Sequence, residues 1–478
     1  MILSKLIRDL KVKKTIGKTD VEIKNIVIDS KLASKNALFI CISGTGFDGH
    51  DYIRQAENYG ASAIITEKEC DCKATQIIVE NTRVAMSVLA AEFYGHADKK
   101  MKIVGITGTN GKTTTTYILK NILEKAGLKC GIIGTLGVIY GDVYREPTLT
   151  TPDPLDLHEI FADMHKSGIK VVVMEVSAHA LFLDKVEGIN FEVGIFTNLT
   201  QDHLDFFENL ENYKKAKMKL FENGRCKFVV SNSDDEVGLE IIKTVKNAVS
   251  YGIDNPADVF AVNINESDSG TEYFINLFDR VYEIKTPLIG RFNVYNSLAA
   301  ATASALLGVK TDAAEIGLSD IKTVSGRMEK VYGEKFDVFI DYAHTPDGLK
   351  KSLESLKCLC KKRLICVFGC GGNRDVGKRR LMGKISGEIA DFTVITSDNP
   401  RYEEPMKIIG EIEKGMMEAT KNYVIVQNRT EGIKYALDYA KDGDTVLIAG
   451  KGSERYQEIL GTKHIYNDKD AVKEILNI

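Results

Sequence analysis

Residues 107–115 read Thr-Gly-Thr-Asn-Gly-Lys-Thr-Thr-Thr and combine the residue types that bind nucleotide phosphates. Gly108 and Gly111 allow backbone N–H groups to approach phosphate oxygens closely. Lys112 can neutralise the charge of the terminal phosphates, and the hydroxyl of Thr113 can ligate Mg²⁺. The segment therefore predicts a loop that binds a nucleoside triphosphate.

The surroundings of this loop favour that interpretation, although its spacing is not the strict one. Five residues rather than four separate Gly105 from Gly111, and Ile106 stands where the strict pattern has glycine. An apolar, strand-like run at 103–106 precedes the loop and a helix-like stretch from Tyr117 follows it. An ordinary glycine-rich turn is the alternative.

Charged and amide side chains follow three strand-like runs near the C-terminus, at 364–368, 394–396 and 446–449. Loops at the carboxyl ends of parallel strands meet at one edge of a sheet, where ligands bind. Two cations and two anions at one site suit a zwitterionic ligand, whereas surface ion pairs at loop ends are the alternative. The residues predicted to line this second crevice are Arg374, Asp398, Asn399, Arg401 and Glu454.

The elements that must position these groups fall into three predicted domains, 1–99, 100–327 and 328–478, with 96–100 as a short linker. Short apolar strands alternating with amphipathic helices argue for parallel sheets covered on both faces. We therefore predict an α/β protein with a smaller N-terminal α/β domain, a central P-loop ATPase-like sheet and a C-terminal Rossmann-like domain. The expected strands are 21–28, 37–42, 61–66, 76–79, 103–106, 171–174, 193–196 and 228–230, and the expected C-terminal helices are 378–390, 406–420 and 431–440.

Composition excludes several classes of function. The chain has 478 residues and a formal net charge of −4, which favours neither nucleic acid nor an anionic membrane as partner. Charged residues interrupt the first 14 residues too often for a signal peptide, and no apolar run approaches the roughly 20 residues that span a bilayer. The nine cysteines include no C-x-x-C pair, so we expect idle thiols in a reducing cytosol.

Six separated motifs occur in the order typical of one enzyme family, the Mur ligases, and the chain resembles that family over essentially its whole length. The motifs lie at 108–114, 175–179, 197–205, 290–296, 326–329 and 341–347. These are cytoplasmic, ATP-dependent enzymes that form the amide bonds of the peptidoglycan peptide. The set is most similar to the ligases that add the third amino acid to UDP-MurNAc-L-Ala-D-Glu.

The segment Asp398-Asn399-Pro400-Arg401 resembles the signature of family members that use meso-diaminopimelate. Lysine-adding relatives generally lack this arginine. Diaminopimelate carries a second carboxylate, which the planar fork of Arg401 can bind through two hydrogen bonds. The resemblance completes the amino-acid site with Arg374, Asp398, Asn399, Pro400, Gly450 and Glu454, of which Glu454 suits an ammonium group.

The resemblance implies a stepwise reaction that needs ATP and Mg²⁺. The D-Glu carboxylate attacks the γ-phosphate of ATP to give an acyl phosphate, and the incoming amine then displaces phosphate. The ATP site would comprise Gly108, Thr109, Asn110, Gly111, Lys112, Thr113 and Thr114, with Asn293 and Asn296 near the adenine and Arg327, Asp341 and His344 reaching the nucleotide from the domain junction. The third domain would then close over the second and exclude water.

The metal ligands implied by the resemblance are Thr113, Glu175, His203 and Lys217, and Lys112, Glu175, His203 and Lys217 are the implied catalytic residues. Without the resemblance, each of these residues has an equally good structural interpretation. Glu175 could be a solvated charge at the end of a strand, and His203 could be a helix-cap partner. Lys217 is one of four lysines in 213–221, and this density of lysines by itself indicates a solvated basic face. That segment resembles the family's carbamylated-lysine segment, in which CO₂ converts the ammonium to N6-carboxylysine, an anion able to ligate Mg²⁺.

The UDP-substrate would contact Ser30, Thr150, Thr151, Ser177 and Lys185, with His50 near the UDP end. Four positions depart from the family pattern: Lys31 and Lys185 replace arginines, and Phe207 and Ser453 replace histidines. A divergent paralogue using L-lysine or another amine is therefore one alternative, beside a folylpolyglutamate synthetase-like ligase and a nucleotide-dependent switch protein that does not ligate. The two substrates are the expected partners of a monomer that binds neither nucleic acid nor membrane.

Overall fold

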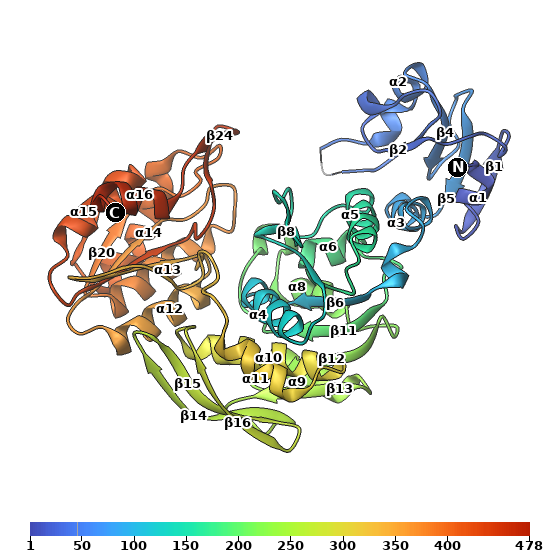
Figure 1. Ribbon diagram of the computed structural model, residues 1–478. Coiled ribbons are helices and arrows are strands. Elements are labelled where there is room, and N and C mark those ends of the chain that lie inside the picture. Colours follow the sequence, from blue (N-terminus) through green and yellow to red (C-terminus); the bar gives the residue numbers. More distant parts are fainter. Residues whose placement is uncertain (45) are drawn as a thin grey trace. The chain divides into compact units, whose positions relative to one another are not determined.

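The chain alternates helices and strands and is an α/β protein, as predicted (Figure 1). The computed structural model describes residues 1–44 and 46–478. It divides into two compact units, the first comprising 1–105, 128–194 and 216–227 and the second 106–127, 195–215 and 228–478. None of the helices in the described ranges is both long and apolar enough to cross a membrane. The boundaries of the three domains stay a prediction.

In the first unit, a five-stranded sheet has the order β1-β5-β4-β3-β2, with only β1 antiparallel to its neighbour. Alternate side chains of its strands pack on helices α1 and α3 on one face and on α2 on the other. This alternation follows from the two-residue period of a strand. The elements are α1 (Leu3–Leu6), β1 (Val12–Ile16), β2 (Asn25–Val27), β3 (Ala37–Ile40), α2 (Ile53–Asn58), β4 (Ala61–Thr66), β5 (Thr75–Val79) and α3 (Thr82–Phe93).

The stretch predicted as a linker is instead ordered. Residues Ala97–Lys100 form the 3-10 helix η3, and the side chains of Ala97 and Asp98 are buried. The run predicted at 21–28 is also shorter than expected, because only Asn25–Val27 form strand β2. At 97–100, polar composition was a poor guide to burial, which depends on the packing of distant segments.

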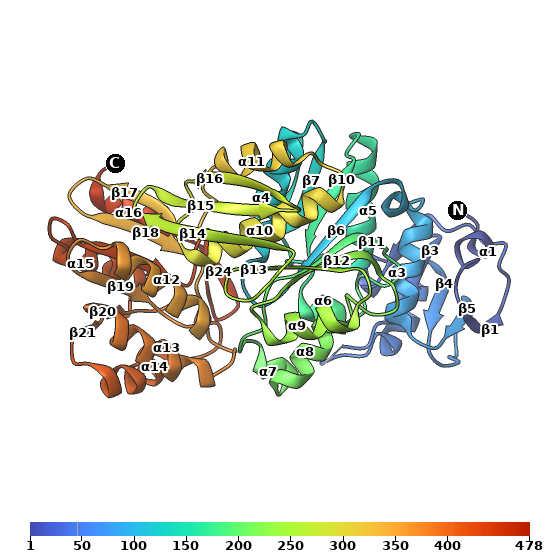
Figure 2. The ribbon, with the colours of Figure 1, turned by 90° about the horizontal axis from the view of Figure 1, so that it is seen from below.

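The largest sheet has eleven strands in the order β16-β15-β14-β13-β12-β11-β6-β10-β7-β8-β9. The four apolar runs predicted for this part of the chain are strands β6, β10, β11 and β12. The antiparallel strands β14, β15 and β16 were not predicted, and Figure 2 shows them side by side. The bounds are β6 (Lys102–Thr107), β7 (Cys130–Gly134), β8 (Gly137–Tyr140), β9 (Val143–Arg145), β10 (Val171–Glu175), β11 (Phe191–Phe196), β12 (Cys226–Asn232), β13 (Ala248–Gly252), β14 (Val259–Ser267), β15 (Gly270–Leu277) and β16 (Arg280–Thr286).

In the second unit, helix α4 (Lys112–Lys125) follows the phosphate loop and begins five residues before the predicted Tyr117. It packs against α10 (Arg291–Leu306) and α11 (Thr311–Ser319). The approach is close, since a Cβ at Gly317 would lie 2.6 Å from the Cα of Ile122. The remaining helices of the middle of the chain are α5 (Pro154–Lys166), α6 (Ala178–Phe182), α7 (Leu204–Phe207), α8 (Leu210–Met218) and α9 (Glu236–Thr244).

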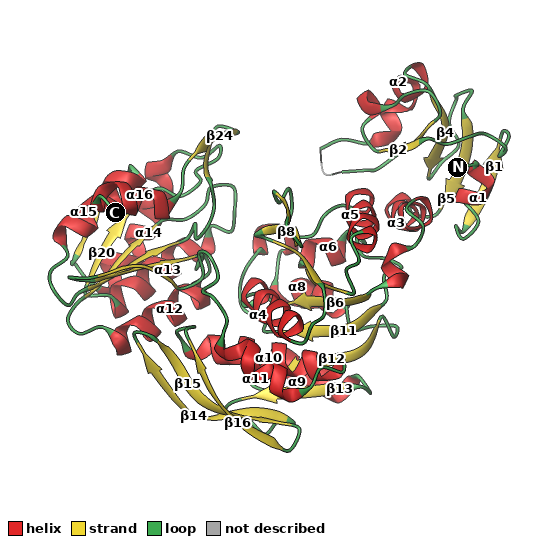
Figure 3. Cartoon of the chain, viewed as in Figure 1, coloured by secondary structure: helices red, strands yellow, loops and turns green. Residues whose placement is uncertain are grey.

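The C-terminal sheet has the order β17-β18-β22-β19-β20-β21 and is parallel except for β17. Helices α12, α13 and α14 pack on one face and α15 and α16 on the other, which is the predicted Rossmann-like arrangement (Figure 3). The antiparallel hairpin of β23 and β24 was not predicted. The bounds are β17 (Glu329–Gly333), β18 (Asp337–Asp341), α12 (Pro346–Leu359), β19 (Leu364–Phe368), α13 (Gly377–Ile389), β20 (Phe392–Ile395), α14 (Pro405–Ala419), β21 (Tyr423–Ile425), α15 (Arg429–Tyr439), β22 (Thr445–Ala449), β23 (Tyr456–Ile459), β24 (Thr462–Ile465) and α16 (Asp468–Leu476).

Candidate active site

The phosphate loop connects β6 to α4, and two of its positions have no room for a side chain. Gly108 has a φ of +147° and Gly111 a φ of +90°. A Cβ at Gly108 would lie 1.8 Å from Oγ1 of Thr197, and one at Gly111 would lie 2.4 Å from Oδ1 of Asn296. A backbone without side chains at the start of a helix can approach phosphate oxygens directly, so the loop fits a nucleotide.

Neutral hydrogen bonds hold the phosphate loop against the residues that follow β11. The backbone N–H of Thr109 donates to the carbonyl of Asn198 (2.8 Å), and the backbone N–H of Asn110 donates to its Oδ1 (3.0 Å). The hydroxyl of Thr197 donates to the carbonyl of Asn110 at 2.6 Å. The loop is thus a preformed frame, as precise positioning of phosphate donors requires.

Two cations lie at the start of α4. The Nζ of Lys112 donates to the carbonyls of Gly108 (2.8 Å) and Thr109 (2.9 Å). The Nη2 of Arg327 donates to Oγ1 of Thr113 at 3.1 Å, and its guanidinium lies 4.3 Å from the ring centre of Tyr342. Arg327 therefore lies against the start of α4, 214 residues away in sequence, and its contact with a nucleotide stays a prediction.

The two asparagines predicted near the adenine lie directly behind the phosphate loop. Oδ1 of Asn296 accepts from the hydroxyl of Thr115 (3.3 Å), and its Nδ2 donates to Oδ1 of Asn293 (2.9 Å). The Nδ2 of Asn293 donates to the carbonyl of Ile289 at 2.7 Å. These buried side chains support the loop, and contact with adenine stays a prediction.

Asp202 is a residue that the sequence analysis left without a role, although it lies inside a quoted motif. It is buried, and three groups lie near its carboxylate: Nε2 of His203 (3.3 Å), Nε2 of His344 (3.5 Å) and Nζ of Lys378 (3.5 Å). Burial alone would raise its pKa, but the hydrogen bond and charge of His344 and the charge of Lys378 hold the pKa of Asp202 well below its usual range. Asp202 thereby gathers two predicted site histidines around one anion.

Asp341, for which the resemblance implies a nucleotide contact, is hydrogen-bonded within the protein. Its carboxylate accepts hydrogen bonds from the backbone N–H of Met328 (2.7 Å) and Ala343 (2.9 Å) and from the hydroxyl of Ser352 (3.1 Å). Burial raises the pKa of Asp341. The side chain ties the segment that carries Arg327 to the end of β18, and a direct nucleotide contact stays a prediction.

In the first unit, four of the predicted site residues form one cluster. Glu175, at the end of β10, is buried and accepts from the backbone N–H (2.9 Å) and hydroxyl (3.1 Å) of Thr135. The hydroxyl of Thr151 donates to the carbonyl of Glu175 at 2.9 Å and accepts from the backbone N–H of Ser177 at 3.0 Å. Thr150 joins through its hydroxyl, 3.2 Å from that of Thr135. Thr135 itself was missed, because nothing in its sequence context separates it from other threonines.

The other residues predicted to bind the UDP-substrate are each held by a neighbour. Nζ of Lys185 lies 2.7 Å from Oδ1 of Asp153, and the hydroxyl of Ser30 donates to Oε1 of Gln55 at 2.7 Å. His50 is almost fully engaged, since Nδ1 lies 2.6 Å from Asp48 and Nε2 accepts from a backbone N–H at 3.2 Å. The side chain of His50 therefore stabilises the N-terminal fold through these two contacts.

Lys217 differs from the lysines around it. Its side chain is 1% exposed, whereas Lys214, Lys215 and Lys219 form partly or well exposed ion pairs with Glu240, Glu211 and Asp184. The interpretation as a solvated basic face is correct for those three and wrong for Lys217. Burial of an ammonium is costly unless its charge is offset or removed.

The residues of the second predicted crevice also come together. The Nδ2 of Asn399 donates to Oε2 of Glu454 at 2.9 Å. Arg401 has a φ of +50°, its Nη1 donates to the carbonyl of Gly372 (2.7 Å), and its Nε lies 3.4 Å from Oε2 of Glu458. A Cβ at Gly371 would lie 2.9 Å from Nη1 of Arg401 and 3.8 Å from Cγ of Arg374, so these two arginines flank one glycine.

These groups are not merely surface ion pairs, because much of the cluster is buried. Asp398 is 8% exposed and Asn399 3%. Burial raises the pKa of Asp398, but the nearby charges of Lys451 and Arg429 outweigh it, so that its pKa lies below the usual range. Sequence reasoning missed Lys451 and Glu458, although the position of Lys451 between two glycines was a usable signal.

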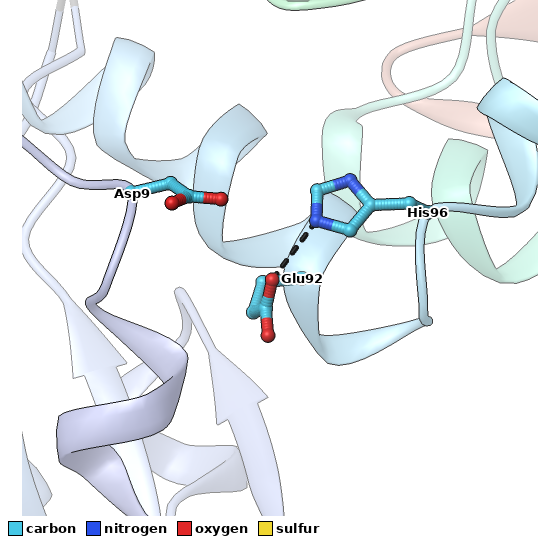
Figure 4. Close-up of side chains that lie close together, drawn as sticks. All are labelled: Asp9, Glu92 and His96. Carbon is cyan, nitrogen blue, oxygen red and sulfur yellow. Dashed lines mark hydrogen bonds and ion pairs between the residues drawn. The ribbon is translucent and has the colours of Figure 1, made fainter.

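Among the described residues, one group of metal-ligand side chains has its ligand atoms within 4.8 Å of one another: Asp9, Glu92 and His96 (Figure 4). Nε2 of His96 lies 2.9 Å from Glu92, and Arg8 lies 3.3 Å from Glu92 and 3.5 Å from Asp9. The guanidinium of Arg8 offsets the charge of both carboxylates. The group is a set of ion pairs that joins the chain after α1 to the end of α3.

Comparison with known proteins matches three family models along the chain. They are the "Mur ligase family, catalytic domain" at 22–94, the "Mur ligase middle domain" at 106–304 and the "Mur ligase, glutamate ligase domain" at 326–452. A Clostridium acetobutylicum protein named UDP-N-acetylmuramoyl-L-alanyl-D-glutamate--2,6-diaminopimelate ligase 1 is 45% identical, over 100% of this chain and 99% of that protein. The ligase of Caldanaerobacter subterraneus subsp. tengcongensis that bears the same name without the number is 44% identical over 96% of each chain.

A solved structure of a UDP-N-acetylmuramoyl-L-alanyl-D-glutamate--2,6-diaminopimelate ligase superimposes with a TM-score of 0.71 and 28% identity, covering 100% of this chain and 99% of that one. The six motifs, the phosphate loop and the three family models agree along the whole length. The chain therefore belongs to the Mur ligase family.

Proposed function

We propose that this protein is the ATP-dependent ligase that joins meso-diaminopimelate to UDP-MurNAc-L-Ala-D-Glu in peptidoglycan synthesis, the reaction of the MurE members of the family. The observation that carries the proposal is the guanidinium of Arg401, which Glu458 and Gly372 hold beside Arg374. The names of the relatives, which include both the UDP-linked dipeptide and diaminopimelate, support it. We place the enzyme in the cytoplasm as a monomer.

Arg401 is suited to select a second carboxylate because its orientation is set by the protein. Glu458 engages its Nε and Gly372 its Nη1, while no described residue accepts a hydrogen bond from Nη2. A planar guanidinium presents its remaining N–H groups as a fork that matches a carboxylate. L-Lysine has no carboxylate on its far carbon, so it would leave this fork unpaired.

Activation of the D-Glu carboxylate begins the proposed reaction, because an acyl phosphate releases phosphate far more readily than a carboxylate releases oxide. The phosphate loop would bind ATP through backbone N–H groups, and Lys112 would neutralise the β- and γ-phosphates. The acyl phosphate then meets the free amine of diaminopimelate, and the amide forms as phosphate leaves. Arg327 would add a second positive charge beside Thr113.

The residues that would hold Mg²⁺ are Thr113, Glu175, His203 and Lys217. When bound, Mg²⁺ would offset the negative charge that develops during phosphoryl transfer. The burial of Lys217 supports its conversion to N6-carboxylysine, because carbamylation replaces a buried ammonium by an anion that can ligate a metal. Mass spectrometry of the intact protein at low and high bicarbonate tests the modification.

The substrates would be divided among three domains. The family matches at 22–94, 106–304 and 326–452 support our domains 1–99, 100–327 and 328–478. The first would bind the UDP end near Ser30, the second ATP and the D-Glu carboxylate that becomes the acyl phosphate, and the third the amino acid. The cluster around Glu175 supports Thr150, Thr151 and Ser177 as contacts for the UDP-substrate, with Lys185 beside them.

Phosphate release from ATP tests the function when UDP-MurNAc-L-Ala-D-Glu is combined with meso-diaminopimelate, L-lysine or L-ornithine. Release only with meso-diaminopimelate is the expected result. Arg401→Ala should then lose the preference, whereas Arg380→Ala, an exposed arginine of α13, should keep it. Release with lysine would show that Arg401 has been misassigned, and no release with any amine would refute the ligase function.

A further inference from the structure

Lys451 is a fully buried lysine in the loop that follows β22, with 0% of its side chain exposed. It lies between Gly450 and Gly452, whose φ values are +113° and +52°. A Cβ at Gly450 would lie 2.8 Å from Oδ2 of Asp398, and one at Gly452 would lie 2.7 Å from the carbonyl of Gly326. The two glycines allow the loop to pack tightly enough to enclose the lysine between them.

The ammonium of Lys451 bridges two residues of the proposed amino-acid site. Its Nζ donates to Oδ1 of Asn399 at 3.0 Å and to Oε2 of Glu454 at 2.8 Å. Asn399 closes the triangle, because its Nδ2 donates to the same Oε2 of Glu454 at 2.9 Å. The amide of Asn399 is therefore fixed in one orientation, with its oxygen toward Lys451 and its nitrogen toward Glu454.

This triangle leaves one atom of Glu454 available to a ligand. Oε2 accepts two hydrogen bonds, whereas Oε1 accepts none from the residues that the structure describes. A carboxylate oxygen held in a fixed position is a good acceptor for a ligand ammonium. Lys451 itself is closed to a ligand by its burial, so its effect on a ligand must pass through Asn399 and Glu454.

The energetic cost of this arrangement indicates that it is not incidental. A buried ammonium is costly unless it is paired and hydrogen-bonded, and an apolar side chain of similar volume would fill the same space at lower cost. All of its hydrogen-bond acceptors belong to the proposed amino-acid site. The ammonium of Lys451 also lies 5.8 Å from the ring centre of Tyr456. Lys463 differs in burial: its ammonium lies 4.3 Å from the same ring centre, but it belongs to the exposed strand β24.

We propose that Lys451 is a positioning residue for the amino-acid substrate, which fixes the side chains of Asn399 and Glu454 so that Oε1 of Glu454 meets the substrate ammonium. This inference rests on the proposed function. It adds to that function a residue that determines the affinity for the amino acid without touching it. The nucleotide and the UDP-substrate should not depend on Lys451.

Steady-state kinetics of Lys451→Met with each substrate varied in turn test the inference. Loss of a buried, charged hydrogen-bond donor should raise KM for meso-diaminopimelate by about 10- to 100-fold. KM for ATP and for the UDP-substrate should stay within about twofold, and kcat should change less than KM for the amine. Lys463→Met is the matched control, because it removes the same charge beside the same ring, and it should leave all three KM values unchanged.

A double-mutant cycle with Glu454→Gln separates positioning from a general effect on folding. If Lys451 acts through Glu454, the double variant should lose much less than the product of the two single losses. Losses that multiply, or a KM for meso-diaminopimelate that is unchanged or lowered in Lys451→Met, would overturn the inference. If Lys451→Met does not fold, Lys451→Gln keeps a shorter hydrogen-bond donor and should show the same selective rise in KM.

The wild-type reaction distinguishes failure of this inference from failure of the proposed function. If the wild-type enzyme releases phosphate with meso-diaminopimelate while Lys451→Met has an unchanged KM for it, only the positioning role is wrong. If the wild-type enzyme uses no diaminopimelate, the proposed function fails before the variant is considered.

Discussion

The phosphate loop and the amino-acid cluster both follow parallel strands, yet they are built in different ways. The groups that hold the phosphate loop against the segment after β11 are neutral: backbone amides, the hydroxyl of Thr197 and the amide of Asn198. Buried charges support the amino-acid cluster, where Lys451 and Arg429 lie next to Asp398 and Asn399. The first site depends on space for a backbone, and the second depends on a balance of charge.

This difference follows from what each site would bind. Phosphate oxygens are recognised well by backbone N–H groups that point to one place, so glycines at two positions suffice. A zwitterionic amino acid needs cationic and anionic side chains within a few ångströms, and in this cluster further buried charges hold those side chains in place. A steric change should therefore damage the first site most, and a change of charge should damage the second.

The largest expected effect is that of Gly108→Ala. The new Cβ would lie 1.8 Å from Oγ1 of Thr197 and would occupy a backbone region that L-residues avoid, so the loop must shift. A displacement of about 1 Å can cost about 100-fold in rate, and ATP-dependent phosphate release should fall by at least about that factor. Gly127→Ala is the control, since its φ is +78° but no atom lies within 4 Å of its Cβ. It should cost about 1 kcal/mol of stability and no activity.

The second effect is on stability, through Arg429→Met. Arg429 donates two hydrogen bonds to Asp468, each at 2.7 Å, and one to the carbonyl of Ala449 at 3.0 Å. Its loss leaves a buried carboxylate without its cation, which should destabilise the protein by about 3–5 kcal/mol in a denaturant titration. Arg380→Met, which breaks an exposed pair with Glu418, should cost less than about 1 kcal/mol. Equal costs for the two variants would mean that the buried pair stabilises the protein no more than an exposed pair does, so the amino-acid cluster would not depend on buried charge.

Thr197→Val should have a smaller effect, confined to the nucleotide. The substitution removes the hydroxyl that donates to the carbonyl of Asn110 at 2.6 Å and leaves that acceptor without this donor. The cost of about 1–2 kcal/mol should appear as a roughly tenfold higher KM for ATP, with KM for the amine unchanged. Thr244→Val, which removes a hydroxyl at the end of α9, should leave both values as they are. A higher KM for the amine instead would mean that the residues which hold the phosphate loop also affect the amino-acid site.

The smallest effect is a dependence of stability on pH that comes from Glu403, beside the amino-acid cluster. Both carboxylate oxygens of Glu403 accept from the buried Arg379 at 2.9 Å, and these hydrogen bonds lower the pKa of Glu403 from about 4.5 to about 2. A carboxyl group with a depressed folded-state pKa stabilises the protein above its unfolded pKa and loses that contribution as pH falls toward the folded value. Wild type should therefore melt at a higher temperature than Glu403→Gln above pH 4.5, and the difference should shrink between pH 4.5 and pH 2.

Two comparisons check this pH dependence. The melting difference between wild type and Thr197→Val should not change across the same range, because a hydroxyl does not titrate there. Glu388→Gln, which affects an exposed pair with Lys384 on α13, should leave the melting temperature unchanged at neutral pH. A melting difference for Glu403→Gln that grows on acidification would contradict the assignment of its pKa.

Sequence reasoning succeeded where the signal is local. The strands at β6, β10, β11, β19 and β22 are short apolar runs bounded by turn residues, and the structure has strands there. The phosphate loop was readable because its glycines, lysine and threonine are contiguous. The antiparallel strands β14 to β16 and the hairpin of β23 and β24 were missed, since half-exposed strands alternate polar and apolar residues and resemble loops in composition.

By itself, the sequence determined the family, the α/β class, the phosphate loop and the residue types that would bind the amino acid, because each of these follows from contiguous residues or from motifs in a fixed order. Only the tertiary structure decided that Lys217 is buried while its neighbours are exposed, that Asp202 gathers two histidines and a lysine, and that Lys451 stands behind Asn399 and Glu454. The physical reason is that burial and charge pairing depend on segments that lie dozens to hundreds of residues apart in the chain, and no local pattern records which of them will meet.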